Sequence, residues 1–87
     1  MRYRSRTEII SDILTAANGG ITKTKIMYKA FLSFNQLREY LTNMVENDLI
    51  TYDSLTQMYR TTPKGMRLLQ MSEQLGSMLL VSDQSKR

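Results

Sequence analysis

The sequence contains no cysteine and no histidine, and each absence excludes a kind of site. Without cysteine the fold has neither disulfides nor thiolate zinc ligands, and without histidine it lacks the usual general base and the commonest metal ligand. No stretch approaches the roughly 20 apolar residues that a membrane span needs, and no long apolar segment follows the N-terminal arginines as in a secretory signal. No glycine-rich phosphate loop occurs either. We therefore expect a soluble cytoplasmic protein that is not an enzyme and has no cofactor, metal or membrane partner.

Charge is spread unevenly over the 87 residues, which are enough for one small domain. Residues 1–38 contain seven Lys or Arg against two acids, residues 39–59 contain four acids and no base, and residues 60–87 are basic again. A basic face beside an acidic segment suits a polyanion partner, although an ordinary solvated surface would also explain these charges.

The first helix is predicted from apolar spacing and from the residues around it. Either Ser5 or Thr7 would cap its start, and the glycines of "NGG" (18–20) would end it. A very short extended piece is expected at Ile21. The apolar stripe follows the i, i+3, i+4, i+7 pattern and consists of Ile9, Ile10, Ile13, Leu14 and Ala17.

Two further helices are predicted close together. Thr22 would cap a short helix that ends near Ala30, and Ser33 would cap a helix over 33–47. Gln36 stands three residues after Ser33, as in a capping box. The expected inward residues of this third helix are Phe34, Leu37, Leu41, Met44 and Val45.

The period then changes to that of a β-hairpin. Two β-prone runs, 49–53 and 58–62, enclose a polar turn region. Two alternative cross-strand pairings are expected, Leu49 with Tyr59 or Ile50 with Met58.

A last helix is predicted over 63–81, with Thr62 as its cap and Pro63 at its first position. Its apolar residues repeat with the 3-4-3 spacing of a coiled coil, which predicts homodimerisation. Residues 82–87 are expected to form a polar tail. The predicted dimerisation residues are Leu68, Met71, Leu75, Met78 and Leu79.

The order of these elements is that of a winged helix-turn-helix, and the sequence resembles a known family. The segments "SRTEIISDILTAANGG", "TKTKIMYKAFLSFNQLREYLTNMVENDLI" and "YRTTPKGMRLL" are similar to archaeal winged helix-turn-helix DNA-binding transcriptional regulators. That family includes small basic ten-kilodalton proteins that dimerise through a long C-terminal helix. The similarity covers residues 5 to about 72, and "TTPKG" is its most specific mark.

The resemblance implies a fold that is mainly α with a small β-hairpin (α+β) and a division into four parts. These are a basic arm (1–6), a winged helix-turn-helix domain (7–62), a dimerisation helix (63–81) and the tail. It further implies a homodimer that binds double-stranded DNA with helix 33–47 in the major groove, but it does not decide between a promoter-specific regulator and a general DNA coater. We expect transcriptional regulation and a place on the nucleoid.

Within such a fold the first helix of the pair crosses the DNA backbone and the second reads bases. Lysine suits phosphate, whereas amide side chains and arginine have the chemistry that base reading needs. Solvation of the lysines, helix capping by Asn35 and Gln36, and a free solvated N-terminus remain open alternatives. The predicted DNA-binding residues are Arg2, Arg4, Arg6, Lys23, Lys25, Tyr28, Lys29, Ser33, Asn35, Gln36, Arg38, Asn43 and Arg60.

Two other functions remain open. The predicted wing tip "DSLTQ" (53–57) carries an acid and no base, which favours a winged-helix module that binds protein instead of DNA. A chromatin-type protein that coats DNA without regard to sequence would have the same basic first half.

Overall fold

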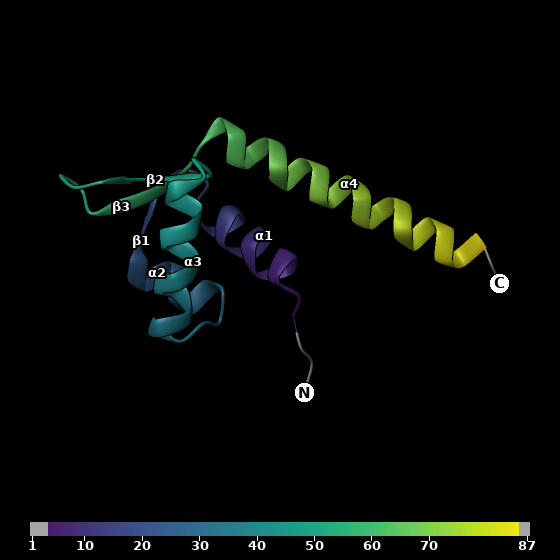
Figure 1. Ribbon diagram of the computed structural model, residues 1–87, viewed down its shortest axis with the longest axis horizontal. Helices are drawn as coiled ribbons and strands as arrows, with labels where there is room; N and C mark the ends of the chain where they lie inside the picture. The colour runs from purple at the N-terminus through teal and green to yellow at the C-terminus, as the bar shows by residue number, and fades with distance from the viewer. Residues whose placement is uncertain (1–3, 86–87) are drawn as a thin grey trace.

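The computed structural model describes residues 4–85, with side chains described as far as Gln74, and this part of the chain forms four helices and a three-stranded sheet. Three helices gather beside the sheet, while the fourth runs away from them (Figure 1). The predicted fold class, mainly α with a small β-hairpin, is confirmed. The elements in chain order are α1 (Arg6–Ala17), β1 (Ile21–Thr22), α2 (Lys23–Lys29), α3 (Phe34–Glu46), β2 (Ile50–Asp53), β3 (Met58–Thr61) and α4 (Pro63–Ser85).

Helix α1 begins with a complete capping box. The Glu8 backbone N–H donates to Ser5 Oγ over 3.1 Å, and the Ser5 backbone N–H donates to Glu8 Oε1 over 2.9 Å. Ser5, and not Thr7, is therefore the cap, because it satisfies a backbone donor that the first turn leaves unpaired. Arg6 consequently belongs to the helix and not to an arm that precedes it.

The sheet has the order β1-β3-β2, with both neighbouring pairs antiparallel. Both predicted cross-strand pairings are wrong, because the strands pair three positions further along: Tyr52 lies opposite Tyr59, and Asp53 opposite Met58. The turn determines this register. The Gln57 backbone N–H donates to the Asp53 carbonyl oxygen over 2.7 Å, and Gln57 has the positive φ of 58° that closes a short loop. The predicted short extended piece is confirmed as β1, which pairs Ile21 with Tyr59.

The core lies where α1, α2 and α3 meet the start of the sheet. Two residues expected to point inward, Phe34 and Val45, are exposed instead. Leu37, Leu41 and Met44 define the buried stripe of α3, and Val45 is rotated by about 100° from Met44 around the helix axis. The buried hydrophobic residues are Ile13, Leu14, Ala17, Ile26, Ala30, Leu32, Leu37, Leu41, Met44, Ile50 and Leu69.

The start of α4 is fixed to the rest of the domain by close contacts. Thr62 caps it as predicted: its Oγ accepts from the Gly65 backbone N–H over 3.0 Å and donates to the Asp48 carbonyl oxygen over 2.6 Å. Thr61, which is buried, donates from its hydroxyl to the Leu14 carbonyl oxygen over 2.7 Å. These bonds set the direction in which α4 leaves the domain.

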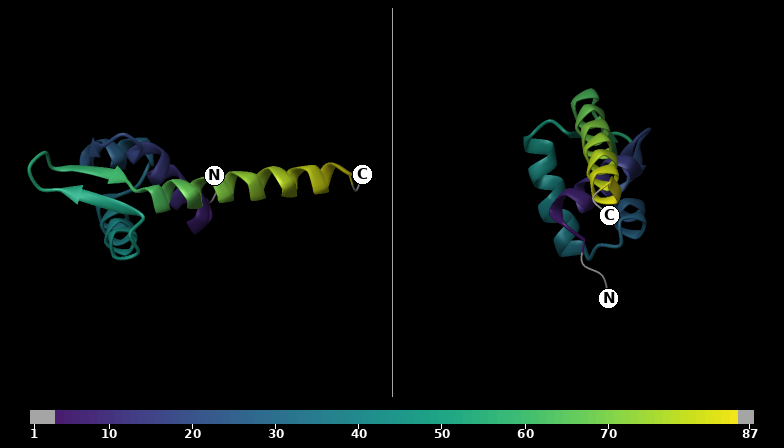
Figure 2. Two further views of the ribbon diagram at one scale, coloured as in Figure 1. Left: turned by 90° about the horizontal axis from the view of Figure 1, so that it is seen from above. Right: turned by 90° about the vertical axis from the view of Figure 1, so that its right-hand side faces the viewer.

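Helix α4 is longer than its sequence pattern predicted. It runs to Ser85 and so includes part of the segment 82–87 that was expected to be a polar tail. Its 23 residues correspond to about 35 Å of helix, and Figure 2 shows that most of this length projects beyond the other elements.

Candidate nucleic-acid interface

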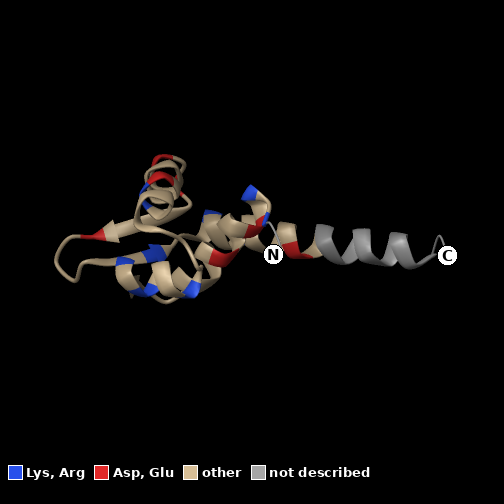
Figure 3. Cartoon of the chain, turned by 90° about the horizontal axis from the view of Figure 1, so that it is seen from below, with Lys and Arg blue, Asp and Glu red and all other residues tan. Residues whose placement is uncertain are grey.

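Helix α2 presents a basic face. Lys25, Tyr28 and Lys29 are exposed at i, i+3 and i+4, so they share one side of the helix. Lys23, at the start of α2, is half-buried, and its Nζ lies 4.6 Å from the centre of the Phe34 ring. Figure 3 shows the basic residues of α2 on one side of the molecule, while acidic residues lie on α3 and the hairpin. Lys25 and Lys29 therefore lie together, whereas Lys23, two positions before Lys25, lies on the side of the helix that faces Phe34.

The start of α3 combines capping with exposed polar groups. Gln36 Oε1 accepts from the Ser33 backbone N–H over 3.0 Å, and the Gln36 backbone N–H donates to Ser33 Oγ over 3.2 Å. The predicted capping box is confirmed, and bidentate reading of a base by Gln36 would have to break it. Asn35 and Arg38 are exposed, and within residues 4–74 neither side chain has a hydrogen-bond or ion-pair partner.

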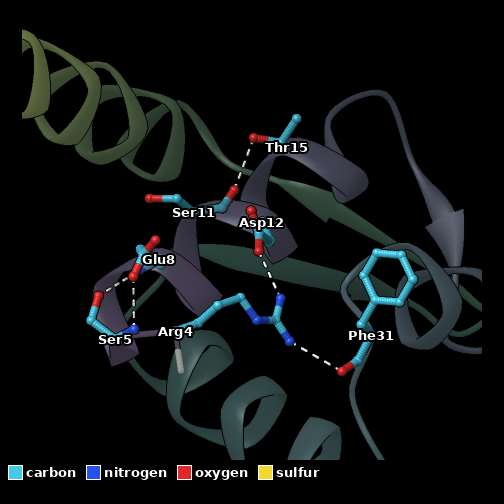
Figure 4. A network of polar contacts seen from close by, with 7 residues as sticks. All are labelled: Arg4, Ser5, Glu8, Ser11, Asp12, Thr15 and Phe31. Carbon is cyan, nitrogen blue, oxygen red and sulfur yellow. Dashed lines mark hydrogen bonds and ion pairs between the residues drawn. The ribbon is translucent and has the colours of Figure 1, made fainter. Parts of the chain in front are cut away.

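Arg4 is tied to the surface of the folded domain by two contacts, as Figure 4 shows. Its Nη1 lies 2.8 Å from Asp12 Oδ2 on α1, and its Nη2 donates to the Phe31 carbonyl oxygen over 3.1 Å. Phe31 is 84% exposed in the turn between α2 and α3 and has a positive φ of 53°. The alternative of a free solvated terminus is therefore wrong for Arg4, which ties the chain start to this turn. Arg2 lies outside the described residues.

Arg6 and Arg38 come from different helices but line the same hollow, of about 370 Å³. Asn43, another predicted site residue, lies on its wall, so three of the predicted residues meet here. Arg60 does not join them: its Nη1 donates to the Gly19 carbonyl oxygen over 3.0 Å and so ties the α1–β1 loop to β3. The full lining is Arg6, Arg38, Glu39, Tyr40, Thr42 and Asn43.

A second hollow, of about 330 Å³, separates α3 from the hairpin. Tyr52 and Tyr59 line it, and neither was predicted as a site residue. Burial raises the pKa of the Tyr59 hydroxyl above its ordinary value, and the neighbouring Tyr52 adds to this shift. The sequence pattern could have indicated this pair only if the register of the two strands had been predicted correctly, because the register decides which residues lie opposite each other. The full lining is Lys23, Arg38, Leu41, Thr42, Val45, Glu46, Tyr52 and Tyr59.

The hairpin tip is closed by a hydrogen bond within the turn and carries no base. Asp53 Oδ1 accepts from the Leu55 backbone N–H over 2.9 Å, so the carboxylate is used within the turn. Leu55 is 94% exposed at the tip. Within residues 4–74 no cluster of three or more acids that could hold a metal ion occurs. No helix in the described range is both long and apolar enough to cross a membrane.

The arrangement of a helix pair, a third helix and a hairpin corresponds to a known family. A model of the winged helix-turn-helix matches residues 3–79. The chain belongs to the winged helix-turn-helix family. In this family's terms α2 and α3 form the helix-turn-helix and the β2–β3 hairpin is the wing, and the predicted family resemblance is confirmed.

Two proteins show how this winged helix-turn-helix chain relates to others. An uncharacterised protein of Methanocaldococcus jannaschii is 37% identical over 73 residues, which cover 83% of this chain but only 34% of that protein. The chain thus spans about a third of that relative's length. The crystal structure of Sso10a-2, a DNA-binding protein from Sulfolobus solfataricus, has a TM-score of 0.83 and 24% identity, and the match covers 95% of this chain and 92% of that one.

The predicted dimerisation residues fall on α4, beyond the winged core. Leu68 is partly buried against the core, whereas Met71 is 65% exposed. Leu69, one position away, is buried, so the domain itself covers this first part of the helix. The side chains of Leu75, Met78 and Leu79 lie outside the described residues.

Proposed function

We propose that this protein binds double-stranded DNA as a homodimer, with α3 in the major groove. The observation that carries the proposal is the exposed start of α3, where Asn35 and Arg38 have no partner within the described side chains and where Lys23 of α2 lines the same hollow as Arg38. The fold supports it, because Sso10a-2, which has the same architecture, is a DNA-binding protein.

Helices α2 and α3 would contact different parts of the DNA, because their exposed side chains differ in chemistry. The α2 lysines are flexible point charges that suit phosphate, and Tyr28 between them can add a hydroxyl contact. Arg38 can donate to guanine through two bonds and Asn35 can pair with adenine, whereas Gln36 remains in its capping box. Glu39 and Glu46 leave α3 itself with a net negative charge, so most of the affinity must come from α2 and from Arg6.

The salt dependence of binding tests the phosphate contacts. Replacing Lys23, Lys25 and Lys29 by alanine should reduce the slope of log affinity against log salt by about 0.9 for each lost contact. Arg67→Ala, which removes an exposed charge from α4, is the control and should leave the slope unchanged. An unchanged slope in the triple variant would show that these lysines do not touch phosphate.

Base reading is tested by comparing a promoter fragment with random duplex. Arg38→Ala should lower the discrimination between them by about 1–3 kcal/mol without affecting the fold. An equal loss on both duplexes would assign Arg38 to the backbone. Equal affinity of the wild-type protein for both duplexes would favour chromatin-type coating over sequence-specific transcriptional regulation; either role would place the protein on the nucleoid.

Dimerisation is proposed through the part of α4 beyond Met71. The exposed Met71 and the 3-4-3 spacing that continues through Leu75 and Met78 support it. Two linked recognition helices would bind neighbouring sites together and raise affinity without new contacts in each domain. Sedimentation at micromolar concentration should show a dimer that Leu75→Asp with Leu79→Asp converts to a folded monomer. A monomeric wild-type protein would contradict the proposal.

A second candidate, a winged-helix module that binds protein, is favoured by the tip of the wing. The tip has no base, and its Leu55 side chain is almost fully exposed. If the wild-type protein bound no duplex DNA even at low salt, the protein-binding module would be the better explanation of its function.

A further inference from the structure

The face of the hairpin that packs on the core extends beyond it, and two tyrosines occupy the extension. Ile50 and Thr61 lie opposite each other and are buried at the core end of this face. Because residues i and i+2 of a strand share a face, Tyr52 and Tyr59 continue it toward the tip. Their ring centroids are 4.8 Å apart with the planes tilted by 45°, and Tyr52 is 48% exposed. Tyr59 thus supports the Tyr52 ring from one side and leaves part of it open.

Two hollows meet at this tyrosine pair, and both have Lys23 on their wall. The one toward α3 has a volume of about 330 Å³ and also contacts Arg38. The other, toward the start of α2, has a volume of about 470 Å³ and is lined further by Thr22, Thr24 and Gln57. A basic and aromatic groove therefore passes between the wing and the helices.

Lys23 is placed between two aromatic surfaces. Its Nζ lies over the exposed Phe34 ring, while the same side chain lines both hollows beside Tyr52. Alternating aromatic rings and positive charges along a groove suit a nucleic-acid strand whose bases are unpaired, because rings stack on base faces and cations accompany the phosphates. A duplex exposes the edges of its bases and hides their faces, so duplex binding leaves these rings without a use.

We propose that the groove between the wing and the helices binds single-stranded nucleic acid, with an unpaired base stacked on Tyr52. Lys23 and Arg38 lie at the groove wall, where they can contact the phosphates on either side of that base. The site extends the function beyond the duplex reading proposed for α3, and it shares only Lys23 and Arg38 with it.

The experiment measures fluorescence anisotropy with labelled single strands of about 12 nucleotides, oligo-dT and oligo-rU, and with a duplex in parallel. Tyr52→Ala removes the ring on which one base would stack, and this should lower the affinity for single strands by roughly 5- to 150-fold. Tyr52→Phe keeps the ring and should bind like the wild-type protein. Leu55→Ala, which removes an exposed side chain from the same hairpin, is the matched control, and circular dichroism checks that each variant is folded.

We expect Tyr52→Ala to bind oligo-dT, oligo-rU or both more weakly, with its duplex affinity unchanged within about twofold. The ratio of the wild-type affinities for oligo-dT and oligo-rU tells whether the groove prefers a DNA or an RNA backbone. Quenching of the intrinsic tyrosine emission on binding would support stacking directly, since the chain has five tyrosines and no tryptophan. The proposal is overturned if the wild-type protein binds neither single strand, or if Tyr52→Ala weakens single strand and duplex equally. Because duplex binding is measured separately, failure of this site leaves the proposed duplex function standing.

Discussion

Gly65, in the first turn of α4, allows that helix to approach the sheet closely, and replacing it with alanine should destabilise the fold. A Cβ there would clash with the backbone carbonyl oxygen of Leu49, and it would lie 2.8 Å from Thr61 Cγ2 and 3.0 Å from Leu14 Cδ2. The Leu49 oxygen cannot easily move, because it also accepts from the Thr62 backbone N–H over 3.1 Å. The alanine methyl group would therefore clash with a backbone oxygen that is held in place.

Two opposing terms set the size of the effect. Alanine gains up to about 1 kcal/mol over glycine in helix propensity. Overpacking of a tight site costs about 1–3 kcal/mol and more where backbone must shift, so we expect a net loss of about 2 kcal/mol. For a domain of this size that loss lowers the Tm by roughly 8–16 °C.

Thermal unfolding followed by circular dichroism measures this change for Gly65→Ala. Gln70→Ala, at an exposed position of the same helix, is the control and should change stability by less than about 0.5 kcal/mol. An unchanged or higher Tm for Gly65→Ala would refute the reasoning, because it would mean that α4 can move away from Leu49 without loss. The direction of α4 would then not be fixed by this contact.

Three further changes test other parts of the fold. Phe31→Gly should leave the Tm unchanged or raise it by a few degrees, because glycine relieves a positive φ and little packing is lost from an exposed ring; a clear fall in Tm would show that the ring packs. Ser33→Ala should lower stability by about 0.5–2 kcal/mol in denaturant unfolding through loss of the α3 cap, and no loss would mean that the cap contributes nothing. The raised pKa of Tyr59 means that the folded state holds the Tyr59 hydroxyl proton more tightly than the unfolded state does. The contribution of the protonated hydroxyl to stability is therefore complete below about pH 10 and is lost as pH rises through the folded pKa. Unfolding measured between pH 9 and about 11 should show this loss for the wild-type protein and less of it for Tyr59→Phe; identical pH profiles would contradict it.

The sequence alone determined the local structure of this protein. The Ser33–Gln36 capping box, the Thr22 and Thr62 caps and the apolar stripe of α1 depend on residues within a few positions of each other. Interactions over so short a separation depend on residue types at fixed local spacings, so they can be read directly from the sequence. The same is true of the charge segregation that places the lysines on α2. The family resemblance could also be recognised from the sequence, because it rests on these local patterns and their order.

Only the tertiary structure decided which side chains are left free and which meet across the fold. Arg4 and Arg60 have the same charge as the α2 lysines, yet each donates to a backbone carbonyl distant in sequence. The pairing of Tyr52 with Tyr59 depends on the register that the Asp53–Gln57 turn imposes, and a register error of three positions, being odd, exchanges the two faces of a strand. The aromatic groove could not be predicted because it forms only where the hairpin extends past the helical layer. That overhang is a property of how the elements pack, and no local pattern encodes it.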